Sequence, residues 1–125
     1  MDPLLNAILA ISPDVRYASI YRNGELSTAE RPGLHGASSA ESDRYEELLV
    51  NPTLLTLTRQ RGDIDCGGLE FVVIRYGNFF QFVLPTHFGH VSVAIEPHAD
   101  PLALAAPIRA AVRASSSASP VPAQA

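Results

Sequence analysis

Residues 69–85, LEFVVIRYGNFFQFVLP, are the densest run of large apolar side chains in this 125-residue chain. Gly77-Asn78 interrupts the run with a dipeptide suited to a two-residue primed turn, so we predict a β-hairpin. Counting outward from the turn pairs Val73 with Phe82 and Phe71 with Leu84 on one face, and Val72 with Val83 and Ile74 with Gln81 on the other. Both faces are largely apolar, whereas a hairpin with one solvated face alternates apolar and polar residues. We therefore expect the hairpin to be covered on both faces or at its edge.

The composition fits one globular domain. Hydrophobic residues make up 46% of the chain and charged residues 18%, and a chain of this length buries about two-thirds of its unfolded surface. The net charge of −4 argues against the basic footprint that nucleic-acid binding needs. Cys66 is the single cysteine. No segment approaches the ~20 apolar residues of a membrane span. The apolar N-terminus begins with an acid, unlike a secretory signal. These features indicate a cytoplasmic protein.

Two local signals organise the first third of the chain. Leu4, Ile8 and Ile11 recur at helical spacing after a capping Asp2-Pro3, which predicts a helix over residues 3–12. Asn23-Gly24 then predicts a second hairpin, with strands near residues 18–21 and 25–29.

A central helix is expected next. Ser38 and Glu41 have the spacing of a capping box, and apolar residues recur from Tyr45 to Leu57. Asn51-Pro52 can break one helix or start another, so we expect a kinked or two-part helix that ends near Gln60.

The remaining elements follow the apolar hairpin. Residues 91–95 alternate as a fifth strand, and Asp100-Pro101 begins a last helix to about Arg113. Residues 114–125 lack core-forming side chains and are expected to be a flexible Ser/Ala/Pro tail. Residues 1–113 then form one α/β sandwich, an α+β fold ordered α-β-β-α-β-β-β-α around a five-stranded, mainly antiparallel sheet.

Metal and nucleophile patterns are weak in this chain. His87 and His90 lie three residues apart and Asp65, Cys66 and His98 can join them, but no paired cysteines support zinc. Cys66 as a nucleophile needs a neighbouring histidine, and a small half-buried residue is the simpler interpretation. We expect no metal and no cofactor.

The order of these elements resembles a roadblock/LC7 domain, the profilin-like family of dynein light chains, bacterial polarity regulators and lysosomal scaffold subunits. The resemblance covers residues 3–113. It rests on PDVRYASIYRNGELSTA as the first hairpin, and on GGLEFVVIRYGNFFQFVLP followed by FGHVSVAIEP as the second hairpin and last strand. Asn51-Pro52 and Pro107 depart from the family's usual helices.

The resemblance implies a two-fold dimer in which the central helix (about Ser42 to Gln60) and the following strand (Leu69 to Tyr76) meet their symmetry mates. It assigns Leu48, Leu49, Leu54, Leu55, Glu70, Val72, Ile74 and Tyr76 to this interface. The physical interpretation agrees, because a long β-branched edge strand without proline or lysine is an aggregation template unless something pairs with it.

The function implied by the resemblance is a non-enzymatic module that scaffolds or regulates a small Ras-like GTPase. Its partners would be itself or a paralogous roadblock subunit, and the GTPase. Arg59 and Arg61 either contact an acidic partner or a nucleotide phosphate, or only close the helix C-terminus.

Two other functions stay open at this stage. The first is a PAS-like or GAF-like sensor, which shares a five-stranded sheet and binds a small ligand. The second is a small enzyme that uses Cys66 or the histidines.

Overall fold

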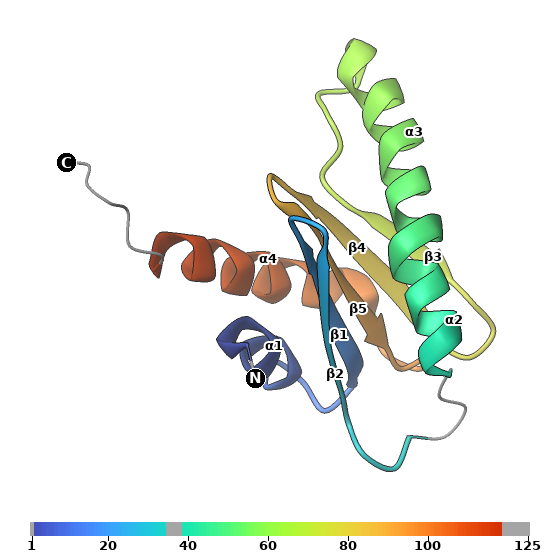
Figure 1. The fold of residues 1–125 in the computed structure, drawn as a ribbon, viewed down its shortest axis with the longest axis vertical. Coiled ribbons are helices and arrows are strands. Elements are labelled where there is room, and N and C mark those ends of the chain that lie inside the picture. Colours follow the sequence, from blue (N-terminus) through green and yellow to red (C-terminus); the bar gives the residue numbers. More distant parts are fainter. Residues whose placement is uncertain (1, 35–38, 119–125) are drawn as a thin grey trace.

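The computed structural model describes residues 2–34 and 39–118 (Figure 1). The helices are α1 (Pro3–Leu9), α2 (Ala40–Tyr45), α3 (Asn51–Asp65) and α4 (Pro101–Ala118), with a π-helical segment η1 (Glu46–Val50) between α2 and α3. The strands are β1 (Val15–Arg22), β2 (Glu25–Glu30), β3 (Val72–Arg75), β4 (Phe80–Thr86) and β5 (Gly89–Ile95). They form one antiparallel sheet in the order β2-β1-β5-β4-β3, which confirms the predicted fold class and element order.

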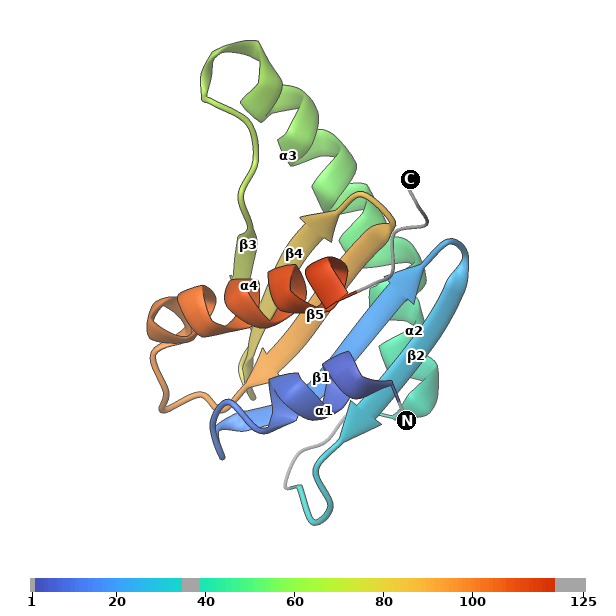
Figure 2. The same cartoon turned by 90° about the vertical axis from the view of Figure 1, so that its left-hand side faces the viewer.

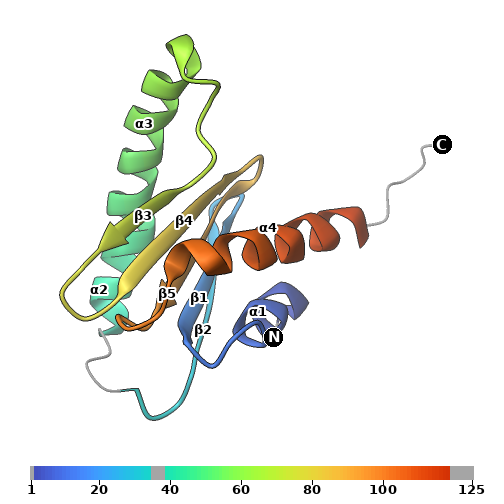
Figure 3. The ribbon, with the colours of Figure 1, turned by 180° about the vertical axis from the view of Figure 1, so that it is seen from behind.

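Helices cover both faces of the sheet. α1 and α4 lie on one face, and α2 and α3 lie on the other (Figures 2 and 3). The apolar core lies between the sheet and α1 with α4, and its buried members include Leu5, Ile8, Ile20, Phe82, Val93, Ile95 and Ile108. The opposite face of the sheet is more polar, with Tyr17, Ser19, Gln81 and Ser92 among its residues. This polar face positions the site described below.

The first helix and hairpin follow their sequence signals. Asp2 Oδ1 accepts a hydrogen bond from the Leu4 amide at 2.8 Å, although α1 ends at Leu9 rather than at residue 12. Asn23 and Gly24 have φ values of 51° and 89°, which is the backbone of the predicted primed turn.

The turn of the second hairpin differs from its prediction. Neither Gly77 nor Asn78 has a positive φ, so the primed turn predicted there is wrong. The Tyr76 amide donates to the Phe79 carbonyl at 2.9 Å, and Arg75 Nη1 donates to the Tyr76 and Gly77 carbonyls. The side chain of Arg75 thus supports a turn that needs no left-handed residue.

The predicted register of this hairpin is confirmed, but its first strand is shorter. Val72 pairs with Val83, Val73 with Phe82 and Ile74 with Gln81, as counted from the sequence. The ladder spans Val72–Arg75 instead of Leu69–Tyr76. It stops two residues before Pro85 on β4, and proline has no N–H to donate.

The central helix is continuous through Pro52. We define it as residues 40–65, which comprise α2, η1 and α3. Pro52 has no N–H, and in a regular helix its ring would meet the carbonyl of Leu48. The π-helical segment removes this conflict by widening the turn, with the Asn51 amide donating to the Glu46 carbonyl. The predicted kink or break is therefore replaced by a π-turn.

Both ends of the central helix also differ from expectation. Ser39 caps it, with its Oγ accepting from the Ser42 amide at 3.1 Å, whereas Ser38 of the predicted capping box lies outside the described residues. The helix ends at Asp65 rather than near Gln60.

The last helix begins as predicted. Asp100 Oδ1 accepts from the Leu102 amide at 3.0 Å. The helix continues past Arg113 to Ala118, so residues 114–118 of the expected tail are helical. The remainder of that expected tail lies outside the described residues.

Candidate functional site

The central helix and the segment that contains β3 lie side by side. Near the helix C-terminus, the Gly68 amide donates to the Gly62 carbonyl at 3.0 Å, and a Cβ on Gly62 would lie 3.0 Å from the Gly68 backbone. Near its start, Tyr76 Oη donates to Glu46 Oε1 at 2.9 Å. Contacts at both ends therefore hold the β3 segment along the helix.

The central helix carries most of the exposed apolar surface. Of the six large hydrophobic side chains that are exposed in the described residues, five lie on it: Tyr45, Leu48, Leu49, Leu57 and Ile64. Leu57 is 60% exposed and Ile64 75%. In Figure 1 the α3 end of the helix rises beyond the strands of the sheet, and both side chains keep most of their surface exposed.

Leu57 and Ile64 share one side of the helix with two half-buried apolar residues, Val50 and Leu54. Val50, Leu54, Leu57, Arg61 and Ile64 follow one another at spacings of four, three, four and three residues, the spacing of a coiled-coil seam. We call Val50, Leu54, Leu57 and Ile64 the apolar stripe. Such a seam is the surface with which one helix packs along another.

The two edges of the sheet differ in character. β3 is one edge, and Val72, Val73 and Ile74 on it are β-branched and half-buried. β2 is the other edge, and it is mostly polar, with exposed Glu25 and Glu30 at its ends. Charge protects an edge strand from pairing, so β3 is the edge suited to receive another strand.

The structure separates the predicted interface residues into three groups. Leu48 and Leu49 are exposed, whereas Leu54, Val72, Ile74 and Tyr76 are half-buried. Leu55 is only 4% exposed, so it packs inside the chain and offers a partner little side-chain surface. Glu70 is exposed and ion-paired with Arg109 at 3.2 Å.

The two predicted partner-binding arginines are exposed. Arg61 Nη1 lies 2.7 Å from Asp65 Oδ1 one turn further along the helix, so a local ion pair occupies this side chain. Arg59 lies on the same helix.

A buried polar cluster anchors the central helix to the sheet. Glu47, on η1, has no exposed surface. Its Oε1 accepts from Asn51 Nδ2 at 2.9 Å and lies 2.8 Å from His90 Nε2. Its Oε2 accepts from three further donors on the strands, which are Tyr17 Oη, Gln81 Nε2 and Ser92 Oγ. We call these six residues the Glu47 cluster.

Burial changes the titration of the groups around this cluster. The pKa of Tyr17 is raised, first by burial and then by the neighbouring Glu47. Burial and the hydrogen bond to Glu46 raise the pKa of Tyr76 to about 12. Both phenols therefore remain protonated donors at neutral pH.

The pKa of Glu46 is also raised, mainly because burial disfavours its charge. Since the folded state binds this proton more tightly than the unfolded state, the ionised carboxylate destabilises the fold above the ordinary Glu pKa of about 4.3. Glu46→Gln is expected to increase the free energy of unfolding at pH 7, and this gain should vanish as the pH falls below 4. Urea titrations at several pH values measure it, with exposed Glu41→Gln as control. A Glu46→Gln variant that loses stability at pH 7 would contradict the expectation.

Comparisons with known proteins agree with this architecture. No protein-family model matches the sequence, and no curated protein matches it. Among solved structures, the chain is similar to the crystal structure of a roadblock/LC7 domain from Streptomyces avermitilis. The TM-score is 0.69 at 19% identity, over 94% of this chain and 95% of that one. The chain has the roadblock/LC7 fold.

In this roadblock/LC7 fold, the residues that were considered for metal or nucleophilic chemistry lie in different parts of the structure. His90 is buried in β5 and bound to Glu47, while Cys66 is exposed at the end of the central helix, so the interpretation of Cys66 as half-buried is wrong. No group of three or more His, Cys, Asp or Glu in residues 2–34 and 39–118 can hold a metal ion. No helix in the same ranges is long and apolar enough to cross a membrane.

Two functional features of this roadblock/LC7 fold were missed by sequence reasoning. The apolar stripe was missed because Pro52 was treated as a break, although its seam spacing runs on to Ile64. The buried anchor Glu47 was missed because its partners lie on strands far away in the sequence. The sequence pattern that could have indicated this cluster was a set of polar residues at inward-facing strand positions: Gln81 on β4, and His90 and Ser92 on β5.

Proposed function

We propose that this chain is a non-enzymatic interaction module that works as a two-fold dimer. The observation that carries the proposal is the open β3 edge held along the central helix, which itself bears the apolar stripe. A symmetric partner would pair β3 with β3 into one continuous sheet and place the two helices against each other. The partner is a second copy or a related roadblock subunit.

The two edges of the sheet support a closed dimer rather than a filament. A two-fold contact at β3 uses the apolar edge of both copies at once. The ends of the joined sheet would then be the β2 strands, where Glu25 and Glu30 oppose further pairing.

The dimer would present a composite surface to a small Ras-like GTPase or to another scaffold subunit, in regulation of the polarity, motility or trafficking type. The support for this partner is the likeness to a roadblock/LC7 domain. Arg59, exposed on the central helix, is a suitable contact for an acidic partner.

Light-scattering chromatography at micromolar concentration tests the dimer. We expect the measured mass of the native protein to be twice that of one chain. Both the Val72→Arg and the Leu57→Glu variants should have the mass of a single chain. Val72→Arg puts a charge at the β3 edge, and Leu57→Glu puts one in the stripe at a side chain that is 60% exposed. Thr28→Arg, at an exposed position of the β2 edge, is the matched control and should stay dimeric.

A native monomer would overturn the dimer. A dimer that dissociates with Thr28→Arg but not with Val72→Arg or Leu57→Glu would place the interface elsewhere. The GTPase proposal is tested separately, by capture of purified small GTPases loaded with GDP or a GTP analogue on the native dimer and on the Leu57→Glu variant. Absence of capture by the dimer in both nucleotide states would refute it.

A further inference from the structure

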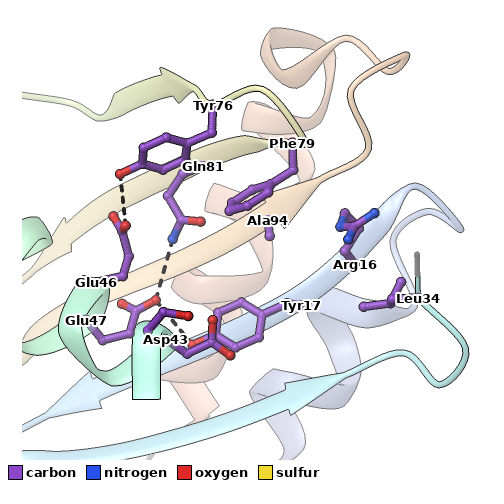
Figure 4. A pocket seen from close by; sticks show the side chains of 11 residues that line it. Arg16, Tyr17, Leu34, Asp43, Glu46, Glu47, Tyr76, Phe79, Gln81 and Ala94 are labelled. Atoms are coloured by element: carbon purple, nitrogen blue, oxygen red, sulfur yellow. Dashed lines mark hydrogen bonds between the residues drawn. The ribbon is translucent and has the colours of Figure 1, made fainter. Parts of the chain in front are cut away.

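A cavity of about 220 Å³ lies between the start of the central helix and the polar face of the sheet (Figure 4). The helix contributes Asp43, Glu46 and Glu47, and β1 contributes Tyr17. The β3–β4 turn closes another side with Tyr76 and Phe79. The volume is below the roughly 300–1,000 Å³ of drug-sized sites, so the cavity fits a compact ligand.

The charge on the cavity wall is mainly negative. Figure 4 shows Asp43, Glu46 and Glu47 together at one end and Arg16 at the other. Arg16 Nη1 is ion-paired with Glu96 Oε1 at 3.1 Å, and the Arg16 side chain is buried. Because Glu96 balances the one cation among the described lining residues, Arg16 does not cancel the negative charge of the Glu46 carboxylate.

One of these carboxylates has an unused acceptor. Glu46 Oε1 accepts from Tyr76 Oη at 2.9 Å, whereas Glu46 Oε2 is buried and has no hydrogen-bond partner among the described residues. A buried carboxyl oxygen without a donor costs free energy. Because Glu46 lines the cavity, a ligand that reaches this oxygen can supply the missing donor.

Aromatic rings line the space next to this acceptor. The rings of Tyr76 and Phe79 lie 5.4 Å apart, centroid to centroid, and Tyr17 lies on the wall toward the sheet. The guanidinium of Arg16 already lies 5.9 Å from the Phe79 centroid. Ring faces attract cations and at the same time bury the apolar part of a ligand.

We propose that this cavity binds a compact organic cation, an alkylammonium or alkylguanidinium, whose N–H donates to Glu46 Oε2 and whose alkyl part lies against Tyr76 and Phe79. This function goes beyond the proposed dimer and does not depend on it. A monomeric chain would present the same cavity.

Titration of butylammonium chloride into the ¹⁵N-labelled full chain at low ionic strength, followed by NMR, tests the site. We expect saturable shifts in the amides of residues 43–47 and 76–81. Butanol and sodium butyrate, of matched size, should give no saturable shifts there. Binding should weaken as the pH falls, because burial raises the pKa of Glu46 and the protonated carboxyl attracts the cation less.

Glu46→Gln should weaken butylammonium binding about ten-fold or more, since it removes a charge-assisted hydrogen bond. Glu41→Gln makes the same charge change at an exposed position of the same helix and should bind like the native chain. Phe79→Leu, a second variant that keeps every carboxylate, should weaken binding several-fold through loss of the ring face.

Three results would overturn the proposal. The first is the absence of saturable shifts with butylammonium, and the second is equal binding of butanol or butyrate. The third is that folded Glu46→Gln and Phe79→Leu variants, as shown by their spectra, bind butylammonium with the affinity of the native chain.

Discussion

Glu47→Ala is expected to lower the free energy of unfolding by about 3–5 kcal/mol. The side chain has no exposed surface, and it is the common partner of a histidine, two amides and two hydroxyls. Truncation would leave these buried polar groups without their acceptor and would open a cavity beneath the helix. Urea unfolding monitored by circular dichroism measures the loss.

Two further variants separate the causes of this loss. Glu47→Gln keeps the size of the side chain but replaces one acceptor oxygen with a donor amide, so an intermediate loss of about 1–3 kcal/mol is expected. Glu41→Ala removes an exposed acid from the same helix and should cost at most about 1 kcal/mol. A Glu47→Ala variant as stable as Glu41→Ala would show that the cluster does not anchor the helix.

Gly89→Ala is expected to lower the free energy of unfolding by about 3 kcal/mol or more. Gly89 begins β5 and pairs with Arg22 on β1. A Cβ at this position would lie 2.1 Å from the carbonyl oxygen of Tyr21, at a φ of +153°. Backbone cannot yield as a flexible side chain can, so β1 and β5 would have to separate at the end of their ladder.

Gly77→Ala is the matched control for this substitution. Gly77 also lies in a turn between two strands, but a Cβ there would meet nothing within 4 Å, and its φ is not positive. Alanine at a compatible position reduces the entropy of the unfolded chain, so the change should be neutral or stabilising by up to about 1 kcal/mol. Equal effects of Gly77→Ala and Gly89→Ala in thermal or urea unfolding would argue against the steric explanation.

The Glu47 cluster and the apolar stripe use different residues of the central helix. Glu47 faces the sheet, where four of its five polar partners lie, while Leu57 and Ile64 remain open to an external surface. The polar contacts fix the orientation of the helix without using Leu57 or Ile64. Those residues are therefore available to a partner.

Local sequence signals identified most of the elements correctly. Asn23-Gly24 predicted its primed turn, Asp2 and Asp100 predicted two helix starts, and counting outward from Gly77-Asn78 predicted the register of the second hairpin. Each of these features depends on residues within a few positions of one another. Propensity, capping and side-chain periodicity are therefore sufficient to determine them.

The same local rules failed at two places where a different local conformation replaces the predicted one. Gly77-Asn78 was expected to form a primed turn, but Arg75 holds another conformation. Pro52 was expected to break or kink a helix, but a π-turn accommodates it.

The sequence alone determined the order of the helices and strands, the register of the second hairpin and the apolar character of the β3 edge. Only the tertiary structure decided that Leu55 is buried while Leu57 is exposed, and that Glu47 meets Tyr17 and Ser92, which lie 30 and 45 positions away. The physical reason is that periodicity specifies which residues share a face. Which face becomes buried, and against which partner, depends on how distant elements pack.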